Sequence, residues 1–395
     1  MTPKKRTSAA EPLSLLDRIH AIGREVVAPH AAAVDRDGRF PAEAFDALKR
    51  AGMLSAYVPR ESGGYGLSVS ELVAVCEALG HYCASTAMVY AMHQIQVACL
   101  VHHGGASPFI RRYLREIVDR QLLLASATTE LGIGGDVRTS RCAVEVEGER
   151  FTLEKQAPVI SYAEVADAIL VTARRSSRSL PSDQVQVVVR REDVKLTPLS
   201  GWDTLGFRGT CSLGFTLRGE GHVEQIVPVP YADVHTRTMH PFSHSVWSGL
   251  WLGIACDAVN RARASVRAEA RKTPGTLPPT VLRLAEVDAT LFSMRAGVLQ
   301  TVAEYEALLA LNDPAAFTAD FAFPLRVNNL KITSSQLLID IVGRAMLVCG
   351  ISGYRNDSPH SLGRHLRDAY GASIMVSNDR ILGQSASLQI MRREE

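Results

Sequence analysis

The sequence predicts a mainly α-helical protein with a β domain in its centre. Three observations predict it: apolar residues recur with a helical period up to about residue 120, alternate in twos in the middle of the chain, and return to the helical period afterwards. No strand–helix alternation occurs in the middle block, which argues against a parallel doubly wound sheet. We therefore expect a polar tail over 1–10, an N-terminal α-helical domain over 11–122, a middle β domain over 123–230 and a C-terminal α-helical bundle over 231–395.

The first helical domain carries start and stop signals. Pro41 opens one helical stretch and Gly52 stands just past its end, as helix boundaries prefer. Ser68 followed by Glu71 has the spacing of a capping box, in which each side chain bonds a free backbone N–H. These signals predict helices on both sides of the Gly-rich segment VPRESGGYGLS, which we expect to be a loop.

The middle and C-terminal blocks differ in their apolar period. Valines alternate with other residues over 185–189, as in a strand with one buried face. Val246–Val259 is apolar almost all round, which predicts a buried helix. Thr280–Ala310 and Leu325–Val348 have the pattern of long amphipathic helices that pack into a bundle.

The composition excludes several classes of protein. Lysine and arginine number 43 against 41 aspartate and glutamate, so the net charge of +2 favours neither a nucleic-acid nor an anionic-membrane partner. No stretch of about 18 residues is free of polar punctuation, and the basic N-terminus lacks the apolar run of a signal peptide. Seven cysteines, an odd number, make no disulfide framework. We therefore expect a cytoplasmic protein that does not bind a membrane.

Two apparent ligand motifs fail on inspection. Gly132 and Gly134 begin a dinucleotide-like glycine pattern, but Val137 replaces the third glycine and no βαβ unit surrounds it. His102 and His103 are adjacent and cannot share a helix face, and no other ligand lies at zinc spacing from them. The sequence therefore predicts neither a dinucleotide fingerprint nor a metal site.

Two further segments carry a resemblance to a known family. ASATTELGIGGDV is similar to the family's Thr-Glu-Pro-x-Ala-Gly-Ser-Asp segment, which Thr129, Glu130, Gly134 and Asp136 match. LEKQAPVISYAEVAD is similar to the family's Leu-Asn-Gly-x-Lys-x-Trp-Ile-Thr-Asn-Ala-x-x-Ala-Asp segment. Together with the Gly-rich loop, these segments make the chain resemble an acyl-CoA dehydrogenase over nearly its whole length after the tail.

The resemblance implies a fold, a cofactor and an assembly. The family has an all-α domain, a small β-barrel-like domain and a C-terminal four-helix bundle, with FAD between the last two, and its subunits form homodimers or homotetramers. Thr129 and Ser161 stand where donors bond the flavin ring, and Arg271 stands where an arginine reaches the FAD pyrophosphate of the neighbouring subunit. The implied FAD contacts are Thr128, Thr129, Gly134, Val159, Ile160, Ser161, Arg271, Thr273, Gly350 and Asn378.

Other positions depart from the family pattern or point to the substrate. Val159 replaces an aromatic residue that covers the flavin, and Pro274 replaces a phenylalanine that stacks on adenine. The implied substrate contacts are His93, Gly135 and His244.

The usual catalytic carboxylate is missing. α,β-Dehydrogenation needs a base held against the substrate's α-carbon, which is a glutamate in the family. The two positions that this glutamate takes fall on Val376 and Ser243, and Asp379 lies just beyond the first of them. His244 is the candidate catalytic residue instead, because an imidazole can act as a base near neutral pH.

Three functions are compatible with these residues. The first is FAD-dependent α,β-dehydrogenation of an acyl thioester, linked to CoA or to a carrier protein, with an electron-transfer flavoprotein as acceptor. The second is a monooxygenase on the same scaffold, which receives reduced flavin from a reductase and needs hydroxyl and imidazole groups such as those of Ser161, His93 and His244. The third is a non-redox binding module.

Overall fold

The N-terminal part of the chain is a layer of helices. The computed structural model describes residues 14–272 and 274–391. The predicted capping box is present, because Ser68 Oγ accepts a hydrogen bond from the N–H of Glu71 and the Glu71 carboxylate accepts one from Ser68 N–H. The elements of this layer are α1 (Leu15–Ile22), the π-helical turn η1 (Gly23–Val27), α2 (Ala28–Asp37), α3 (Ala42–Arg50), the 3-10 turns η2 (Met53–Ser55) and η3 (Arg60–Ser62), α4 (Val69–Tyr82), α5 (Ala84–His103) and α6 (Pro108–Arg120).

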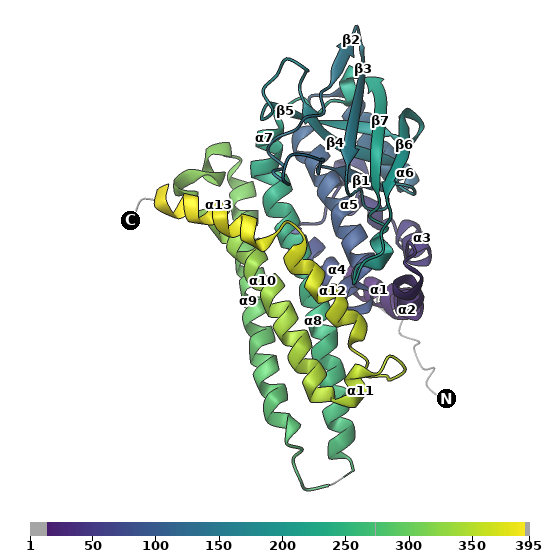
Figure 1. Ribbon diagram of the computed structural model, residues 1–395, viewed down its shortest axis with the longest axis vertical. Helices are drawn as coiled ribbons and strands as arrows, with labels where there is room; N and C mark the ends of the chain where they lie inside the picture. Colours follow the sequence, from purple (N-terminus) through teal and green to yellow (C-terminus); the bar gives the residue numbers. More distant parts are fainter. Residues whose placement is uncertain (1–13, 273, 392–395) are drawn as a thin grey trace, which may run out of the picture.

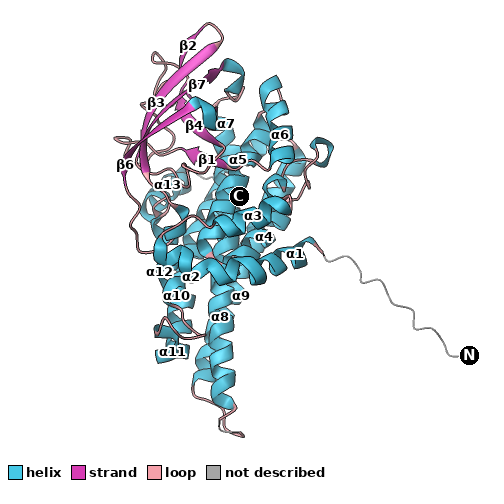
Figure 2. Cartoon of the chain, turned by 90° about the vertical axis from the view of Figure 1, so that its right-hand side faces the viewer, coloured by secondary structure: helices cyan, strands magenta, loops and turns pink. Residues whose placement is uncertain are grey.

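The strands of the middle domain form two small sheets. One has the order β1-β4-β5 and the other β2-β3-β7-β6; β1 runs parallel to β4, and the remaining ladders are antiparallel. They cover one end of the helical layer (Figure 2). The strands are β1 (Leu124–Ala127), β2 (Glu145–Glu147), β3 (Arg150–Ala157), β4 (Ala168–Arg174), β5 (Gln184–Arg190), β6 (Val194–Ser200) and β7 (Gly214–His222).

Three long helices run side by side along the long axis of the molecule and form the C-terminal bundle (Figure 1). The fold class is therefore the one that the sequence predicts, helical at both ends with β structure between them. The elements of this part are α7 (Tyr231–Val234), the π-helical turn η7 (His235–Met239), α8 (His240–Ala270), α9 (Thr280–Leu311), α10 (Ala322–Cys349), α11 (Ile351–Tyr354), α12 (Gly363–Ile374) and α13 (Asn378–Met391).

Helix α8 is buried between the two helical parts, as its apolar sequence predicts. A Cβ atom at Gly253 would lie 2.0 Å from the carbonyl oxygen of Glu77, so only a glycine lets α8 approach α4 this closely. This contact fixes the N-terminal half of α8 against the rest of the protein, and that half carries the histidines discussed below.

Helix α10 is long and apolar enough to cross a membrane by length and composition, with a mean hydropathy of 1.4 in its most apolar window. In this structure it packs against α8, α9 and α12 instead, and half of that window is buried. The buried apolar residues of α10 therefore belong to the core of the bundle.

Candidate functional site

The loop after β1 lies against α13. Gly134 and Gly135 both have positive φ angles, +60° and +76°, and their carbonyl oxygens accept hydrogen bonds from the Arg380 guanidinium at 2.6 and 2.8 Å. Thr129 Oγ1 donates to the carbonyl oxygen of Val159 at 3.2 Å. Residues predicted to contact one cofactor therefore do lie together, and Arg380, which the sequence reasoning missed, holds their loop to the bundle.

Glu130, next to Thr129, has a structural role. Its buried carboxylate accepts hydrogen bonds from Ser140 Oγ and from Cys142 N–H, both at 2.7 Å, and lies 3.7 Å from Lys155 Nζ. Lys155 Nζ also donates to the carbonyl oxygen and to Oγ1 of Thr172, at 2.6 and 3.1 Å. We call Glu130, Ser140, Lys155 and Thr172 the glutamate–lysine cluster. All of its charges have partners.

Ser161 begins a chain of three buried hydroxyl groups. Its Oγ lies 2.8 Å from Ser212 Oγ, which lies 2.7 Å from Thr210 Oγ1. Thr210 donates its single hydroxyl proton to the carbonyl oxygen of Phe207 at 2.8 Å, so Ser212 must donate to Thr210 and Ser161 must donate to Ser212. Ser161 is therefore left with lone pairs and no free proton for any ligand.

Three histidine rings follow one another from η7 into α8; His235 and His240 are half-buried, and His244 is buried. The ring centroids of His235 and His240 are 5.6 Å apart, and those of His240 and His244 are 4.6 Å apart. His240 Nε2 lies 2.9 Å from Asn328 Oδ1 on α10. The first turn of α8 and the second turn of α10 are thus joined by side chains.

The position of the proton on His244 follows from its contacts. Nδ1 lies 3.3 Å from the carbonyl oxygen of His240, which can only accept, so Nδ1 carries the proton and Nε2 is an acceptor in the neutral ring. Nε2 is buried and has no hydrogen-bond partner among the described residues. Burial, with the charges of His240 and Lys331, lowers the pKa of His244 well below 6.5. The expectation of a base that titrates near neutral pH is therefore corrected: His244 is neutral well into the acidic range.

Lys331 lies one helical turn beyond Asn328 on α10, on the same face. Its side chain is fully buried, and its Nζ donates to Asn378 Oδ1 at 2.6 Å. Asn378 in turn donates from Nδ2 to Ser335 Oγ at 3.0 Å. Burial lowers the pKa of Lys331 to about 8, and no carboxylate of the described residues pairs with it. We call His235, His240, His244, Asn328, Lys331 and Asn378 the histidine–lysine cluster.

Neither position of the family's glutamate carries a carboxylate or is near one that replaces it. Val376 has a φ of +53°, which is rare for a β-branched residue, and its side chain is 39% exposed. Ser243 is buried and donates to the carbonyl oxygen of His240 at 3.0 Å. Asp379 is exposed on the first turn of α13. His244 directly follows Ser243 in the chain and is a buried basic group.

His93 differs from His244 because both of its ring nitrogens are occupied. Nε2 donates to the carbonyl oxygen of Leu54 at 2.7 Å, and Nδ1 accepts from the N–H of Leu124 at 3.0 Å. The ring is fully buried, and burial lowers its pKa to about 4. His93 therefore joins the helical layer to β1 and has no nitrogen left for a substrate.

The remaining predicted cofactor contacts do not all meet within one chain. Arg271 is exposed directly after α8, at the end of the bundle far from the strands (Figure 1). Gly350 ends α10 with φ +58° and ψ −140°, a conformation open to glycine. Thr273 lies outside the described residues. Ile160 is buried and Thr128 Oγ1 bonds Ser126 Oγ at 2.8 Å, so both belong to the wall of the middle domain.

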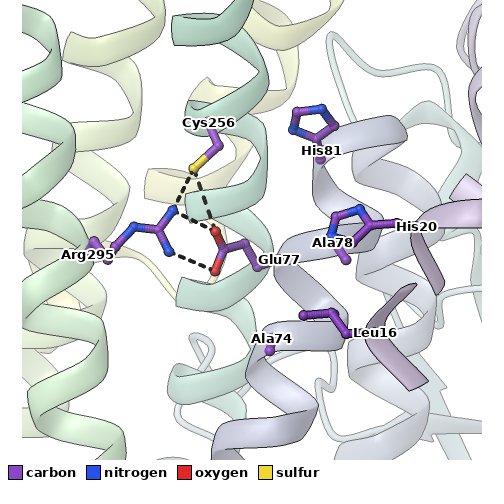
Figure 3. A pocket seen from close by; sticks show the side chains of 8 residues that line it. All are labelled: Leu16, His20, Ala74, Glu77, Ala78, His81, Cys256 and Arg295. Carbon is purple, nitrogen blue, oxygen red and sulfur yellow. Dashed lines mark hydrogen bonds and ion pairs between the residues drawn. The ribbon is translucent and has the colours of Figure 1, made fainter. Parts of the chain in front are cut away.

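A separate cavity of about 240 Å³ lies between α1, α4, α8 and α9 (Figure 3). Its polar side chains bond one another: Arg295 donates to both carboxylate oxygens of Glu77, at 3.2 and 2.7 Å, and Cys256 contacts both groups. Burial raises the pKa of Cys256 to about 12. Glu77, Arg295 and Cys256 thus satisfy one another, and the other polar side chains that line the cavity are the imidazoles of His20 and His81.

The residues around the β1 loop fit a flavin. Leu131, Val159 and Val376 are apolar side chains that are 37 to 45% exposed, and Thr129 Oγ1 bonds the carbonyl oxygen of Val159. A Cβ atom at Gly134 would touch nothing within 4 Å. Exposed apolar side chains, a hydroxyl group and open main chain are the kinds of group that suit a flat aromatic ring with a polar rim.

Comparison with known proteins identifies the family that the sequence resembles. Residues 10–121 match the family model "Acyl-CoA dehydrogenase, N-terminal domain" and residues 243–382 match "Acyl-CoA dehydrogenase, C-terminal domain". Cyclohex-1-ene-1-carbonyl-CoA dehydrogenase of Geobacter metallireducens is 31% identical over 159 residues, which cover 40% of this chain and only 42% of that protein. The amino sugar nitrososynthase DnmZ of Streptomyces peucetius is 25% identical over 348 residues, covering 86% of this chain and 84% of that one.

A solved structure shows the same fold. FMN-bound TdsC of Paenibacillus sp. A11-2 superposes with a TM-score of 0.83 at 20% identity, over 96% of this chain and 98% of that one. TdsC of Paenibacillus sp. A11-2 is a dibenzothiophene monooxygenase.

Proposed function

The chain belongs to the acyl-CoA dehydrogenase family, and from this premise we propose that it is a flavin-dependent monooxygenase that receives reduced flavin from a separate reductase. The observation that carries the proposal is the absence of a carboxylate at both positions of the family base, Val376 and Ser243. Oxygenation needs no base at a substrate α-carbon, whereas dehydrogenation does. The likeness to a nitrososynthase over most of both chains also supports it.

The residues of the chain have separate tasks in this proposal. A bound flavin would supply the activation of dioxygen. Thr129, Val159, Ser161 and the backbone around Gly134 would hold its ring. His244, neutral and with Nε2 free, would accept a proton from the substrate or from water, and the buried surroundings would keep bulk water away from the reacting atoms.

Dehydrogenation of an acyl thioester is the competing function, and the relative from Geobacter supports it. It would require His244 to remove a weakly acidic proton from carbon. A base whose pKa lies well below 6.5 is poorly matched to that task, because a C–H proton is much less acidic than the O–H proton of a phenol or enol and its transfer to such a base is strongly uphill. We therefore rank it second.

One experiment separates the two functions. The purified flavoprotein is mixed anaerobically with a series of acyl-CoA thioesters, and the oxidised flavin absorbance is followed. In parallel it is supplied with NADH, a flavin reductase, ¹⁸O₂ and a series of phenols and amines, and the products are examined by mass spectrometry. We expect that thioesters do not bleach the oxidised flavin. We expect ¹⁸O to be incorporated into a product of the second reaction. Bleaching by a thioester without ¹⁸O incorporation would replace oxygenation by dehydrogenation.

The form of the flavin and the assembly are linked in this proposal. Arg271 directly follows α8, whose C-terminal end lies at the opposite end of the molecule from the strands (Figure 1), and we propose a homodimer or homotetramer in which Arg271 binds the FAD pyrophosphate of a neighbouring subunit. Exposed apolar side chains on α9, α10 and α12 support an interface there; they include Phe292, Leu299, Leu347 and Ile374.

The Arg271→Ala variant tests FAD against FMN. Because the pyrophosphate contact is absent from FMN, we expect FAD affinity to fall about 10- to 100-fold while FMN affinity is unchanged. Arg263→Ala is the matched control, since Arg263 is engaged by Asp288 at 2.9 Å. Equal FAD affinities in the two variants would remove the cross-subunit contact. We also propose a reducing compartment, the cytoplasm, because all seven cysteines are free thiols.

A further inference from the structure

The histidine–lysine cluster contains one free acceptor and one under-used donor. His244 Nε2 is buried without a partner, and the Lys331 ammonium, which has three protons to donate, bonds one oxygen of Asn378. Buried polar groups in proteins are almost always satisfied, so the unpartnered Nε2 of His244, which has no partner among the described residues, requires an explanation.

The two groups lie on neighbouring helices, each one turn beyond a residue of a contact that joins these helices. His240 on α8 bonds Asn328 on α10, and one turn farther along, His244 and Lys331 occupy the corresponding positions. The Lys331 charge is among the causes that lower the pKa of His244, which places the two side chains within electrostatic range. The third side of the cluster is closed by α13, through Asn378 and through Ser385, which accepts a bond from Asn328 at 3.0 Å.

We propose that His244 and Lys331 bind the acidic hydroxyl group of a substrate, a phenol or an enol, and bind it as the oxyanion. The substrate O–H bond breaks and its proton goes to His244 Nε2, while Lys331 Nζ donates to the oxygen that keeps the electron pair. The inference rests on the proposed function, because it names the substrate class of the same site. An ionised phenol or enol is also the electron-rich form that electrophilic oxygenation requires.

Charge balance favours this class of ligand. A buried ammonium without a carboxylate is costly, and an oxyanion is the partner that the described residues do not supply. A carboxylate ligand would satisfy Lys331 but would leave His244 Nε2 facing an acceptor. A neutral ether would accept from Lys331 but has no proton to donate to His244 Nε2. A hydroxyl group uses both, since it donates to one residue and accepts from the other.

The test uses the oxidised holoenzyme without reductant, so that no turnover is involved. The probe is 4-nitrophenol, whose phenolate absorbs at longer wavelength than its neutral form, and binding is followed by difference spectroscopy at pH 6. We expect bound probe to be phenolate although the free probe is mostly neutral at that pH. 4-Nitroanisole, which has no acidic proton, should bind without this spectral change.

Variants separate the two roles. Lys331→Met should weaken binding of the phenolate about 10- to 100-fold, and His244→Phe should bind the probe in its neutral form. Lys272→Met, an exposed lysine after α8, is the matched control and should behave as wild type. Flavin content and circular dichroism of each variant show that it is folded.

The outcomes are decisive. Neutral probe in the wild type, or unchanged phenolate binding in Lys331→Met, overturns the inference. Phenolate binding without any ¹⁸O incorporation would leave the binding site in place and count against the monooxygenase alone.

Discussion

Two lysines are buried among the residues that the structure describes, and their surroundings differ. Lys155 in the middle domain has a carboxylate at 3.7 Å and two oxygens of Thr172 as acceptors, whereas Lys331 in the bundle has one amide oxygen. The glutamate–lysine cluster satisfies its charges internally, as a structural element does. The histidine–lysine cluster leaves a charge and a lone pair available inside the protein, which is typical of sites that bind something. The comparison teaches that burial alone does not separate structural from functional lysines; the number of partners does.

The prediction with the largest expected effect concerns the turnover rate and tests whether the histidine–lysine cluster is functional. His244→Ala should lower turnover about 10²- to 10⁴-fold while the protein keeps its fold and flavin, because it removes the proton acceptor. The wild-type rate should depend on the neutral imidazole through a titration below pH 6.5, since burial lowers that pKa. Steady-state kinetics against pH measure both. A His244→Gln variant with most of the activity would reduce His244 to a residue that shapes the pocket.

The next effect is on stability. Lys155→Met should lower the free energy of unfolding by about 3 kcal/mol, because it leaves the Glu130 carboxylate buried without its cation. Chemical denaturation followed by circular dichroism measures it. A loss below about 1 kcal/mol would mean that the hydrogen bonds from Ser140 and Cys142 hold Glu130 without help, and the two lysines would then not differ as described.

Lys331→Met should instead raise the free energy of unfolding. The pKa of Lys331 falls from 10.5 in the unfolded chain to about 8 in the folded one, so the charged lysine destabilises the fold at pH 7. Methionine should raise the free energy of unfolding by about 1–2 kcal/mol, since a shift of one pKa unit corresponds to about 1.4 kcal/mol and Asn378 loses its donor.

The pH dependence checks the sign of that prediction. Between about pH 8 and 10.5 the unfolded chain holds a proton on Lys331 that the folded chain has released, so wild-type stability gains over this window. The advantage of the methionine variant should therefore shrink as the pH rises through it. A variant that is less stable than wild type at pH 7 would make Lys331 a structural lysine like Lys155.

The smallest effect concerns the hydroxyls near the flavin. Thr129→Val and Ser161→Ala should each weaken flavin binding by about 1 kcal/mol, the usual size of one hydrogen bond. Isothermal titration of the apoprotein with flavin measures this, and Ser126→Ala, which alters a neighbouring hydroxyl pair, is the control. No loss in either variant would place the ring elsewhere.

Much of the fold could be predicted from the sequence because it depends on apolar period. The capping box at Ser68 and the buried helix around Val246–Val259 were visible as patterns and are present. The resemblance to the family also identified Val376 and Ser243 as the positions of the missing glutamate and His244 as the candidate base. It did not indicate Lys331 as functional, although Asn328, Lys331 and Ser335 interrupt an apolar helix on one face. Whether a lysine has a carboxylate partner depends on three helices meeting, and no local pattern records that.

The same limit explains why the sequence does not reveal the contacts that His93 and Arg380 make. A histidine on an apolar helix looks the same whether its nitrogens are free or bonded, and only the approach of Leu54 and Leu124 shows that both are used. Arg380 lies 245 residues from the loop that it holds. Neither contact has a signal in spacing or composition.

The hydroxyl chain from Ser161 to the Phe207 carbonyl has a consequence for how such a protein can be retuned. Each hydroxyl in it has one proton and passes it toward Phe207, so Ser161 can offer a flavin only an acceptor. Loss of the single oxygen of Ser212 would free that proton and turn Ser161 into a donor. An acceptor favours a ring nitrogen that bears hydrogen, as in the reduced cofactor, and a donor favours the bare nitrogen of the oxidised one. If Ser161 faces the flavin as we propose, the reduction potential is set in part by a residue that the cofactor does not touch, and one atom there can reverse its direction.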